Sequence, residues 1–306
     1  MIPIFPHFKK IDIQDKASID SHTAQYKPYS DFIFTNLWAW DTAGERMVSE
    51  LNGNLVVRFT DYNTSEHFLS FLGNNEPEDT AKQLIQFAEQ SSISPVLRFI
   101  SEESAKSLEN SDLTVEEDAD NFDYIFSVHQ LANPQGSKFK KKRHSANRFI
   151  RENSDAVFVL KDFCDAVVQE QLISILRRWE DKKKTDQKIY DLRQEEMAIN
   201  RLLKSANDHT LVLSCIYLHD VMLGFSVDEI LPNKFVISHF LKADISYKGI
   251  YEFLNEKVAQ HLVTLNADLW NWEQDLNIEG LRRLKMSYRP VDFLKKYTVS
   301  FNNKIT

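Results

Sequence analysis

The second half of the chain has the most regular alternation of apolar and polar positions. Three apolar runs, at 211–218, 221–230 and 234–241, are separated by His-Asp and Pro-Asn turns, and this pattern predicts three successive antiparallel strands. Helical periodicity precedes them at 165–180 and 191–207. The pattern then predicts a helix from Gly249 to Leu262, a short strand within ADLWNW (267–272), a helix near 278–286 and a strand near 297–301.

The first half also alternates helix and strand. In PYSDFIFTNLWAW (28–40) the apolar positions Phe32, Ile33, Leu37 and Trp40 follow a helical spacing, which predicts a surface helix. Further along, the pattern predicts strands at 55–59, 94–100 and 122–128, a helix at 78–91, a loop at ANPQG (132–136) and a helix at 137–152.

The element order of the second half is that of the GNAT acyltransferase core, in which the strand before the central helix splays from its neighbour to admit an acyl donor. The first amides of the helix that follows Gly249 would face a phosphate or carboxylate. The alternative is a tight turn that only needs a glycine. The segment SYKG has fewer glycines than the GNAT phosphate loop, which weakens a simple coenzyme A interpretation. The candidate donor-binding turn comprises Tyr247, Lys248 and Gly249.

Composition excludes several classes of protein. The chain has 306 residues, of which 42% are hydrophobic, so it can bury a sizeable core. No apolar run approaches the roughly 20 residues that cross a bilayer, and we expect no transmembrane segment. The N-terminus lacks a secretory pattern and Cys164 and Cys215 are the only cysteines, which favours the reducing cytoplasm. The scattered histidines predict no metal site and no permanently bound cofactor.

The segment GSKFKKKRHSANRF (136–149) is strongly basic in a chain of net charge −8. Seven cations and no acid lie between Lys138 and Arg151, and on a helix they form two neighbouring faces. Such a helix favours an anionic partner: an RNA backbone, a phosphorylated cofactor or an acidic lipid surface. The alternatives are a solvated face or pairing with acids such as Glu116 to Asp120. The candidate anion-binding residues are Lys138, Lys141, Lys142, Arg143, Asn147 and Arg148.

A second dense segment, residues 270–290, mixes acids, cations and a phenol. A carboxylate could take a proton from an amine nucleophile while cations hold a phosphate or an oxyanion. The alternative is helix capping by Asp275 together with ordinary salt bridges. The catalytic candidates are Glu273 and Asp275, and the groups expected to hold the donor are Arg282, Lys285 and Tyr288.

Both segments resemble a known family. FDYIFSVHQLANPQGSKFKKKRHSANRF and WNWEQDLNIEGLRRLKMSYRP, with SDFIFTNLWAW upstream, are similar to a bacterial family related to the C-terminal domain of phosphatidylglycerol lysyltransferase. The resemblance implies an α/β (α+β) fold of two tandem GNAT-like domains, residues 1–155 and 156–306, with mixed, largely antiparallel sheets flanked by helices. The family's motif residues fall on Lys138, Lys141, Lys142, Arg143, Asn147 and Phe149, and on Asn271, Glu273, Gln274, Asp275, Gly280, Leu281, Arg282, Lys285, Ser287 and Tyr288.

The chain departs from the family pattern at a few positions. Trp272 stands where the family has Arg, Asn277 where it has Gly, and His144 where it has Asn. The first change removes a cation beside the expected site. Lipid-modifying members also carry a transmembrane flippase-like region, of which this sequence shows no sign.

The resemblance implies a cytoplasmic transferase that moves an aminoacyl group from charged tRNA, or an acyl group, onto an amine or hydroxyl acceptor. An RNA donor would use the basic helix and would not need a glycine-rich coenzyme A loop. Two alternatives remain: a small-molecule N-acyltransferase that uses acyl-coenzyme A, and a non-catalytic module that binds RNA or an anionic lipid surface peripherally. The sequence does not indicate the acceptor or the oligomeric state.

Overall fold

The computed structural model describes residues 1–61, 64–183 and 192–302. The chain forms two compact units: unit 1 consists of residues 1–123, 274–277 and 293–306, and unit 2 of residues 124–273 and 278–292. Within the described residues, no helix combines the length and the apolar character needed to cross a membrane.

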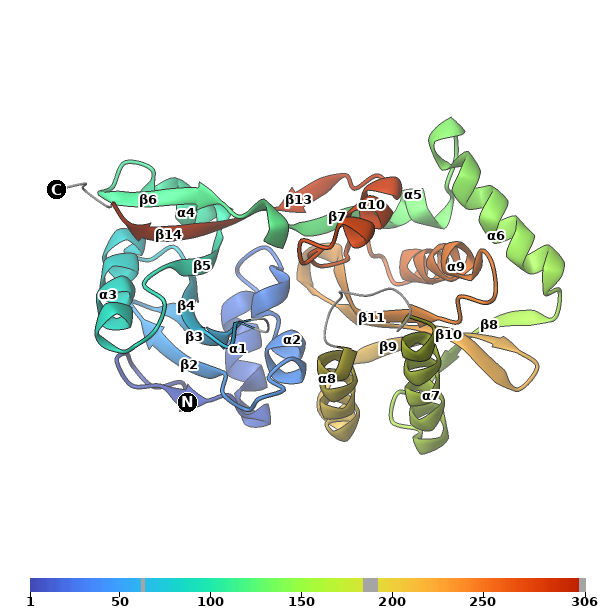
Figure 1. Ribbon diagram of the computed structural model, residues 1–306, viewed down its shortest axis with the longest axis horizontal. Helices are drawn as coiled ribbons and strands as arrows, with labels where there is room; N and C mark the ends of the chain where they lie inside the picture. The colour runs from blue at the N-terminus through green and yellow to red at the C-terminus, as the bar shows by residue number, and fades with distance from the viewer. Residues whose placement is uncertain (62–63, 184–191, 303–306) are drawn as a thin grey trace. The chain divides into compact units, whose positions relative to one another are not determined.

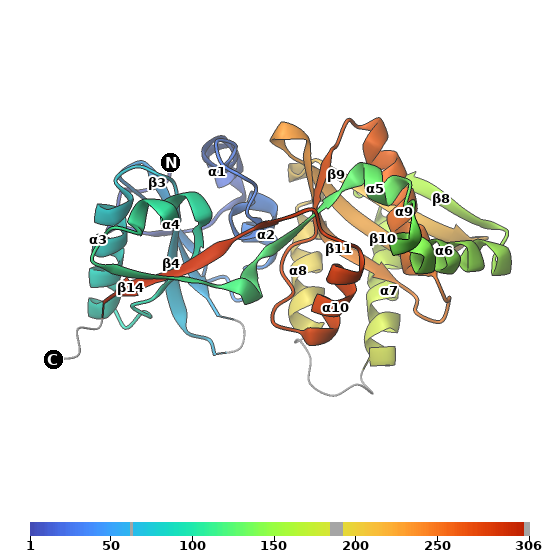
Figure 2. The ribbon, with the colours of Figure 1, turned by 90° about the horizontal axis from the view of Figure 1, so that it is seen from above.

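Unit 1 contains two antiparallel sheets, with the strand orders β1-β2-β3-β4 and β5-β14-β6. Figure 2 shows β14, the last strand of the chain, lying among strands from the first half. The elements are β1 (Lys9–Lys10), α1 (Lys16–Thr23), α2 (Phe34–Ala39), β2 (Met47–Leu51), β3 (Asn54–Thr60), β4 (His67–Leu72), α3 (Pro77–Gln90), β5 (Leu97–Ser101), α4 (Glu102–Leu108), β6 (Leu113–Glu117) and β14 (Lys296–Phe301).

The core of unit 1 lies between these sheets and α3. Leu84 and Ile85 on the buried face of α3 belong to one apolar cluster with Phe71 of β4 and Val299 of β14. Helix α3 begins with Pro77 at its first turn, which suits the fixed φ of proline, and acids follow it at the positive end of the helix dipole.

Unit 2 is built around a seven-stranded sheet with the order β13-β7-β12-β11-β10-β9-β8. Helices α7 and α8 lie on one side of this sheet, and α9, with α6 packed on it, lies on the other (Figure 1). The elements are β7 (Asp123–Ser127), α5 (Val128–Ala132), α6 (Lys140–Glu152), β8 (Ala156–Lys161), α7 (Ala166–Lys183), α8 (Leu192–Lys204), β9 (Leu211–Leu218), β10 (Val221–Ile230), β11 (Phe235–Ala243), α9 (Ile250–Thr264), β12 (Leu269–Asn271), α10 (Glu279–Ser287) and β13 (Asp292–Leu294).

The element order predicted for the second half is confirmed. Strands β9, β10 and β11 are successive and antiparallel, and α9 connects β11 to β12, which pairs with β11 in parallel. This is the order of the GNAT core, and the fold is of the expected mixed α/β class. Residue 191, where the second predicted helix was expected to begin, lies outside the described residues.

The prediction of a surface helix over residues 28–40 is wrong. A 3₁₀ turn at Ser30–Phe32 precedes the short helix α2, whose polar residues Thr35 and Asn36 are as buried as Leu37. Asn36 donates through Nδ2 to the carbonyl of Ser30, and the guanidinium of Arg46 donates to the carbonyls of Asn36 and Leu37. These hydrogen bonds satisfy polar groups that the periodic pattern placed on the surface.

The compact units also differ from the domain bounds expected at 1–155 and 156–306. Residues 124–155 belong to unit 2, because β7 pairs with β12 and α6 packs on α9. Residues 293–306 belong to unit 1, because β14 pairs with β5 and β6.

Candidate functional site

The candidate base Glu273 lies just after β12 in unit 2, on a backbone that is held firmly. Its φ of 57° is in the left-handed region, which costs a non-glycine residue about 1 kcal/mol or more. The Oδ1 of Asn271 accepts the Glu273 N–H at 2.7 Å, and the Glu273 carbonyl accepts from the N–H of Tyr124 and the ammonium of Lys285, both at 3.1 Å. A strained conformation secured on several sides is typical of a functional position.

His239 lies next to Glu273, and Glu229 lies on the other side of His239. The sequence analysis missed both residues. His239 on β11 is fully buried at its side chain; its Nε2 is 2.9 Å from Oε2 of Glu229, and its Nδ1 is 3.9 Å from Oε1 of Glu273. The side chain of Glu273 is 21% exposed, so this carboxylate reaches solvent while the other two groups do not. The arrangement is a carboxylate–imidazole–carboxylate series with one accessible end, which can accept a proton. The feature of the sequence that could have identified His239 is a histidine within the apolar run FVISHFL.

A second buried carboxyl group, that of Asp228, forms a hydrogen bond with a residue of β12. Asp228 on β10 is fully buried, and it accepts hydrogen bonds from Nε1 of Trp270 at 3.2 Å and from Oγ of Ser226 at 2.7 Å. Burial raises the pKa of Asp228 to about 6, although these hydrogen bonds oppose the shift. Asp228 is therefore a structural partner of the strand that carries the site.

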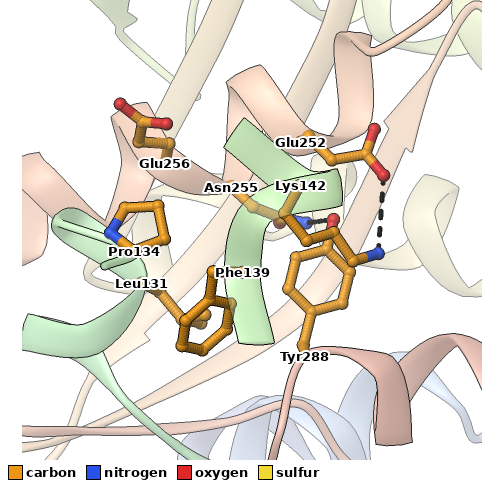
Figure 3. Close-up of a pocket in the computed structure, with 8 residues that line it drawn as sticks. All are labelled: Leu131, Pro134, Phe139, Lys142, Glu252, Asn255, Glu256 and Tyr288. Atoms are coloured by element: carbon orange, nitrogen blue, oxygen red, sulfur yellow. Dashed lines mark hydrogen bonds and ion pairs between the residues drawn. The ribbon is translucent and has the colours of Figure 1, made fainter. Parts of the chain in front are cut away.

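Next to Glu273, the aromatic side chains Trp272 and Tyr288 join the site to a small pocket. Their rings meet edge to face with centroids 5.0 Å apart. The cavity has a volume of about 10 Å³, which is room for about one water molecule, and Figure 3 shows its lining residues. Its walls come from α5, the loop that follows it, α6, α9 and the residue after α10, and the lining residues are Leu131, Pro134, Phe139, Lys142, Glu252, Asn255, Glu256 and Tyr288.

Tyr288 is a buried phenol whose oxygen accepts a hydrogen bond from Nδ2 of Asn255 at 3.1 Å. Burial, and then the nearby Glu252 carboxylate, raise the pKa of Tyr288 above its ordinary value. Because ionisation is opposed, Tyr288 is a neutral hydrogen-bonding group and not an anion at physiological pH. This suits the role of steadying a polar group of the donor, which remains a prediction.

Lys285 has a different role from the expected contact with the donor. Its ammonium donates to the carbonyl oxygens of Trp272 at 2.5 Å and Glu273 at 3.1 Å, and the residue is buried. Lys285 therefore fixes the backbone that carries the catalytic candidate. Arg282, one turn earlier on α10, is half-buried.

The turn at 247–249 begins α9 as predicted, but α6 lies directly against it. Gly249 has φ +88°, and a Cβ built there would lie 2.0 Å from the carbonyl oxygen of Ser145. The glycine is thus required both by its backbone conformation and by the close approach of α6. Tyr247 is half-buried and Lys248 is exposed.

Replacing Gly249 by Ala is expected to destabilise the protein by at least about 2 kcal/mol, because the methyl group must displace helix α6 and the backbone is left-handed. Chemical denaturation would measure this. Gly280→Ala is the matched control, since nothing lies within 4 Å of its added methyl group. In a helix that change is neutral or favourable. Equal stabilities of the two variants would contradict the packing argument.

The basic segment forms a helix as predicted, but its cations divide into two groups. Arg143 donates to the carbonyls of Pro134 and Gly136, Arg148 pairs with Glu152, and Lys142 points into the pocket. The alternative of pairing with acids at 116–120 is not supported at Glu117, which pairs with Lys295. The exposed positions are Lys138, Lys140, Lys141, His144, Asn147 and Arg151.

Of the motif residues, Gln274 and Asp275 belong to unit 1, and Gln274 contacts a buried cluster around Lys296. The Lys296 ammonium pairs with Asp31 and with Asp123, the latter at 2.7 Å, and donates to Oε1 of Gln274 at 2.7 Å. Burial lowers the pKa of Lys296, but the two carboxylates raise it more, so it stays above the ordinary value. Ser30 donates to Asp123 through both its N–H and its hydroxyl.

The second catalytic candidate, Asp275, is also in unit 1. It is fully buried, and its Oδ1 accepts the N–H of Asn277 at 2.9 Å, in a turn typical of aspartate. Asp275 is not the N-cap of α10, which is Ile278, so it forms a local turn, whereas Glu273 has the accessible carboxylate. Among the described residues, no group of histidines, cysteines and acids could hold a metal ion.

Comparison with known proteins agrees with this fold. The family described as phosphatidylglycerol lysyltransferase, C-terminal, matches residues 23–300, and the chain belongs to this family. Its fold is shared with a conserved protein of unknown function from Bacteroides thetaiotaomicron, at 24% identity and a TM-score of 0.85 over 98% of this chain and 100% of the other. No curated protein matches the chain.

Two further solved structures share the fold at lower identity. The C-terminal domain of a putative lysylphosphatidylglycerol synthetase from Agrobacterium fabrum is 12% identical, with a TM-score of 0.67 over 95% of this chain and 93% of the other. L-PGS from Bacillus licheniformis is 14% identical, with a TM-score of 0.65 over 97% and 94%. Family and fold together support a transferase with a GNAT-like fold.

Proposed function

We propose that the protein transfers an aminoacyl group from charged tRNA to an amine or hydroxyl acceptor, with Glu273 as the base. The observation that carries this proposal is the exposed Glu273 carboxylate backed by the buried His239 and Glu229. Family membership supports transferase chemistry. The exposed cations of α6 support a polyanionic donor.

In the proposed reaction, the acceptor nitrogen or oxygen attacks the carbonyl carbon of the aminoacyl ester. Its proton passes to the Glu273 carboxylate, and the bond from the carbonyl carbon to the tRNA ribose oxygen breaks. The ribose oxygen then takes up a proton and leaves as a hydroxyl group, so that the protons of the reaction balance. His239 orients Glu273 and, with Glu229 behind it, can stabilise the proton that Glu273 gains.

The donor would be held by the outer face of α6. Lys140, Lys141 and Arg151 are exposed, and phosphate contacts of this kind supply salt-dependent affinity without sequence specificity. The carbonyl oxygen of Ser145 lies where a Cβ on Gly249 would be, so α6 closes that side of the turn and leaves no room on that side for a coenzyme A pyrophosphate.

We expect charged tRNA to bind with a strong salt dependence that the variant Lys140→Glu/Lys141→Glu reduces. Loss of two phosphate contacts should lower the slope of log affinity against log salt by about 1.5. Filter binding over a salt series would measure it. Lys27→Glu/Lys106→Glu changes the net charge equally at exposed positions in unit 1 and is the control.

The same experiment includes acetyl-coenzyme A as a second ligand. Coenzyme A binding that is insensitive to the α6 variant, without a tRNA signal, would replace the proposal with a small-molecule N-acyltransferase. Equal loss of tRNA binding in both double variants would show a general effect of net charge and would contradict the assignment to α6.

A further inference from the structure

We propose that the protein forms a two-fold symmetric dimer in which strand β8 of unit 2 pairs with β8 of a second copy of the chain. Strand β8 is the last strand of the seven-stranded sheet, and among the described residues it pairs only with β9. In Figure 1 it follows helix α6 at the margin of unit 2. Alternate backbone N–H and C=O groups on its other side are therefore available to a further strand.

The sequence of β8 lacks the features that usually keep an edge strand from pairing with another chain. AVFVLK contains no proline and no charge before Lys161, and all six residues pair with β9 in a regular register. Other edge strands are different: β13 and β1 have only three and two residues, and β6 ends in the acids Glu116 and Glu117. Strand β8 is therefore better suited to pairing than these edges.

The side chains of β8 leave apolar surface on both faces of the sheet. Successive side chains of a strand alternate between the faces, so Val157 and Leu160 lie on opposite faces. Each of the two is 49% exposed, while Phe158 and Val159 between them are half-buried. A strand that pairs with β8 would cover apolar surface on both faces, and this burial stabilises the pair in addition to its backbone hydrogen bonds.

A second copy fits this edge because the segment complements itself in charge. In a two-fold symmetric antiparallel pair, facing residues share one face of the sheet, so the axis passes beside a residue and not between two residues. With the axis beside Phe158, Val157 of one copy lies opposite Val159 of the other. Asp155 of one copy then lies opposite Lys161 of the other, once at each end of the pair. An axis one residue earlier or later places one of these charges opposite a valine instead.

The charged residues and the apolar residues have different roles in this interface. Asp155 and Lys161 are exposed on either side of the apolar positions, so the two pairs that they form select the register more than they add affinity. The affinity comes from the apolar side chains and the backbone hydrogen bonds between the strands. The interface involves neither Glu273 nor tRNA, so it goes beyond the proposed function and does not depend on it.

Sedimentation equilibrium of the full chain over a concentration series would measure the dimer. The subunit mass is 35.7 kDa, and the weight-average mass should rise to twice this value with concentration. Val157→Lys places a charge between the paired strands and should weaken the dimer about 100-fold, because every dimer contains the substitution twice. Val221→Lys is the matched control, since Val221 is 51% exposed but lies on β10, between β9 and β11 in the sheet.

Reversal of the flanking charges tests the register. Lys161→Asp should weaken the dimer about tenfold at low salt, because two acids then face each other at both ends of the pair, and adding Asp155→Lys should restore it. Both positions are exposed, so the fold should be preserved, which circular dichroism would check. Equal weakening by Val157→Lys and Val221→Lys, a dimer that Val157→Lys leaves unchanged, or a double variant that is not restored would overturn the proposal. A chain that stays monomeric at every concentration would also overturn it, in favour of a strand from a different protein.

Discussion

Replacing Lys296 by Met is expected to destabilise unit 1 by about 3–5 kcal/mol, the cost of leaving a buried charge without its partner. Lys296 and Asp123 are fully buried, and Asp31 also pairs with the same ammonium. Burial raises the pKa of Asp31 even though Lys296 opposes the shift, as expected where two carboxylates share one cation. Methionine has a similar length but no charge, so Asp31 and Asp123 lose the ammonium that pairs with both of them.

Urea denaturation would measure this loss. Lys295 is the matched control, because it precedes Lys296 in the same segment and pairs with Glu117 at the surface, where replacement by Met should change little. Adding Asp123→Asn to Lys296→Met should recover part of the stability, since one unpaired carboxylate is then removed. Equal effects of the Lys295 and Lys296 variants would show that the cluster does not hold unit 1 together.

Glu273→Gln is expected to lower the rate of aminoacyl transfer about 100-fold or more while leaving the fold intact. A positioned general base contributes roughly 10²–10⁴-fold, and glutamine keeps the shape of the side chain without accepting the proton. The backbone contacts of Asn271, Tyr124 and Lys285 with this residue do not involve its carboxylate, so stability should be preserved. Single-turnover transfer from labelled aminoacyl-tRNA to an amine would provide the rate.

His239→Gln completes this test, because loss of the imidazole beside Glu273 should also lower the rate. An unchanged turnover in Glu273→Gln would remove the base assignment, whatever the tRNA affinity. Preserved turnover in Glu273→Gln together with loss in Asp275→Asn would instead return the role to Asp275, whose carboxylate is buried in a turn.

The regular apolar runs made much of unit 2 predictable. Strands 211–218 and 221–230 have the predicted bounds, because alternating residues and short turns leave few other pairings. The helical spacing of the apolar residues in 28–40 predicts a surface helix, whereas in the structure the polar residues Thr35 and Asn36 of α2 are buried as well. The periodicity of a sequence shows which positions are polar, but it does not show whether a polar side chain has a hydrogen-bond partner inside the protein.

The site was predictable in its residues more than in their roles. Glu273, Tyr288 and Lys285 were recognised, but the Lys285 ammonium binds backbone carbonyls, and Lys142 serves the pocket instead of the outer face of α6. His239 and Glu229 were missed because they lie in apolar strands with ordinary spacing. Which cations face inward depends on contacts between residues more than 100 positions apart, such as Lys142 and Glu252.

The position of β14 affects how the chain folds during its synthesis. This strand lies between β5 and β6, carries Val299 into the core of unit 1 and supplies Lys296 to Asp31 and Asp123. During synthesis, unit 1 therefore lacks a central strand and a buried cation until residues 296–301 have left the ribosome. A fragment that stops at residue 155 would keep two acids and an open sheet edge, and would be a substrate for chaperones and proteases.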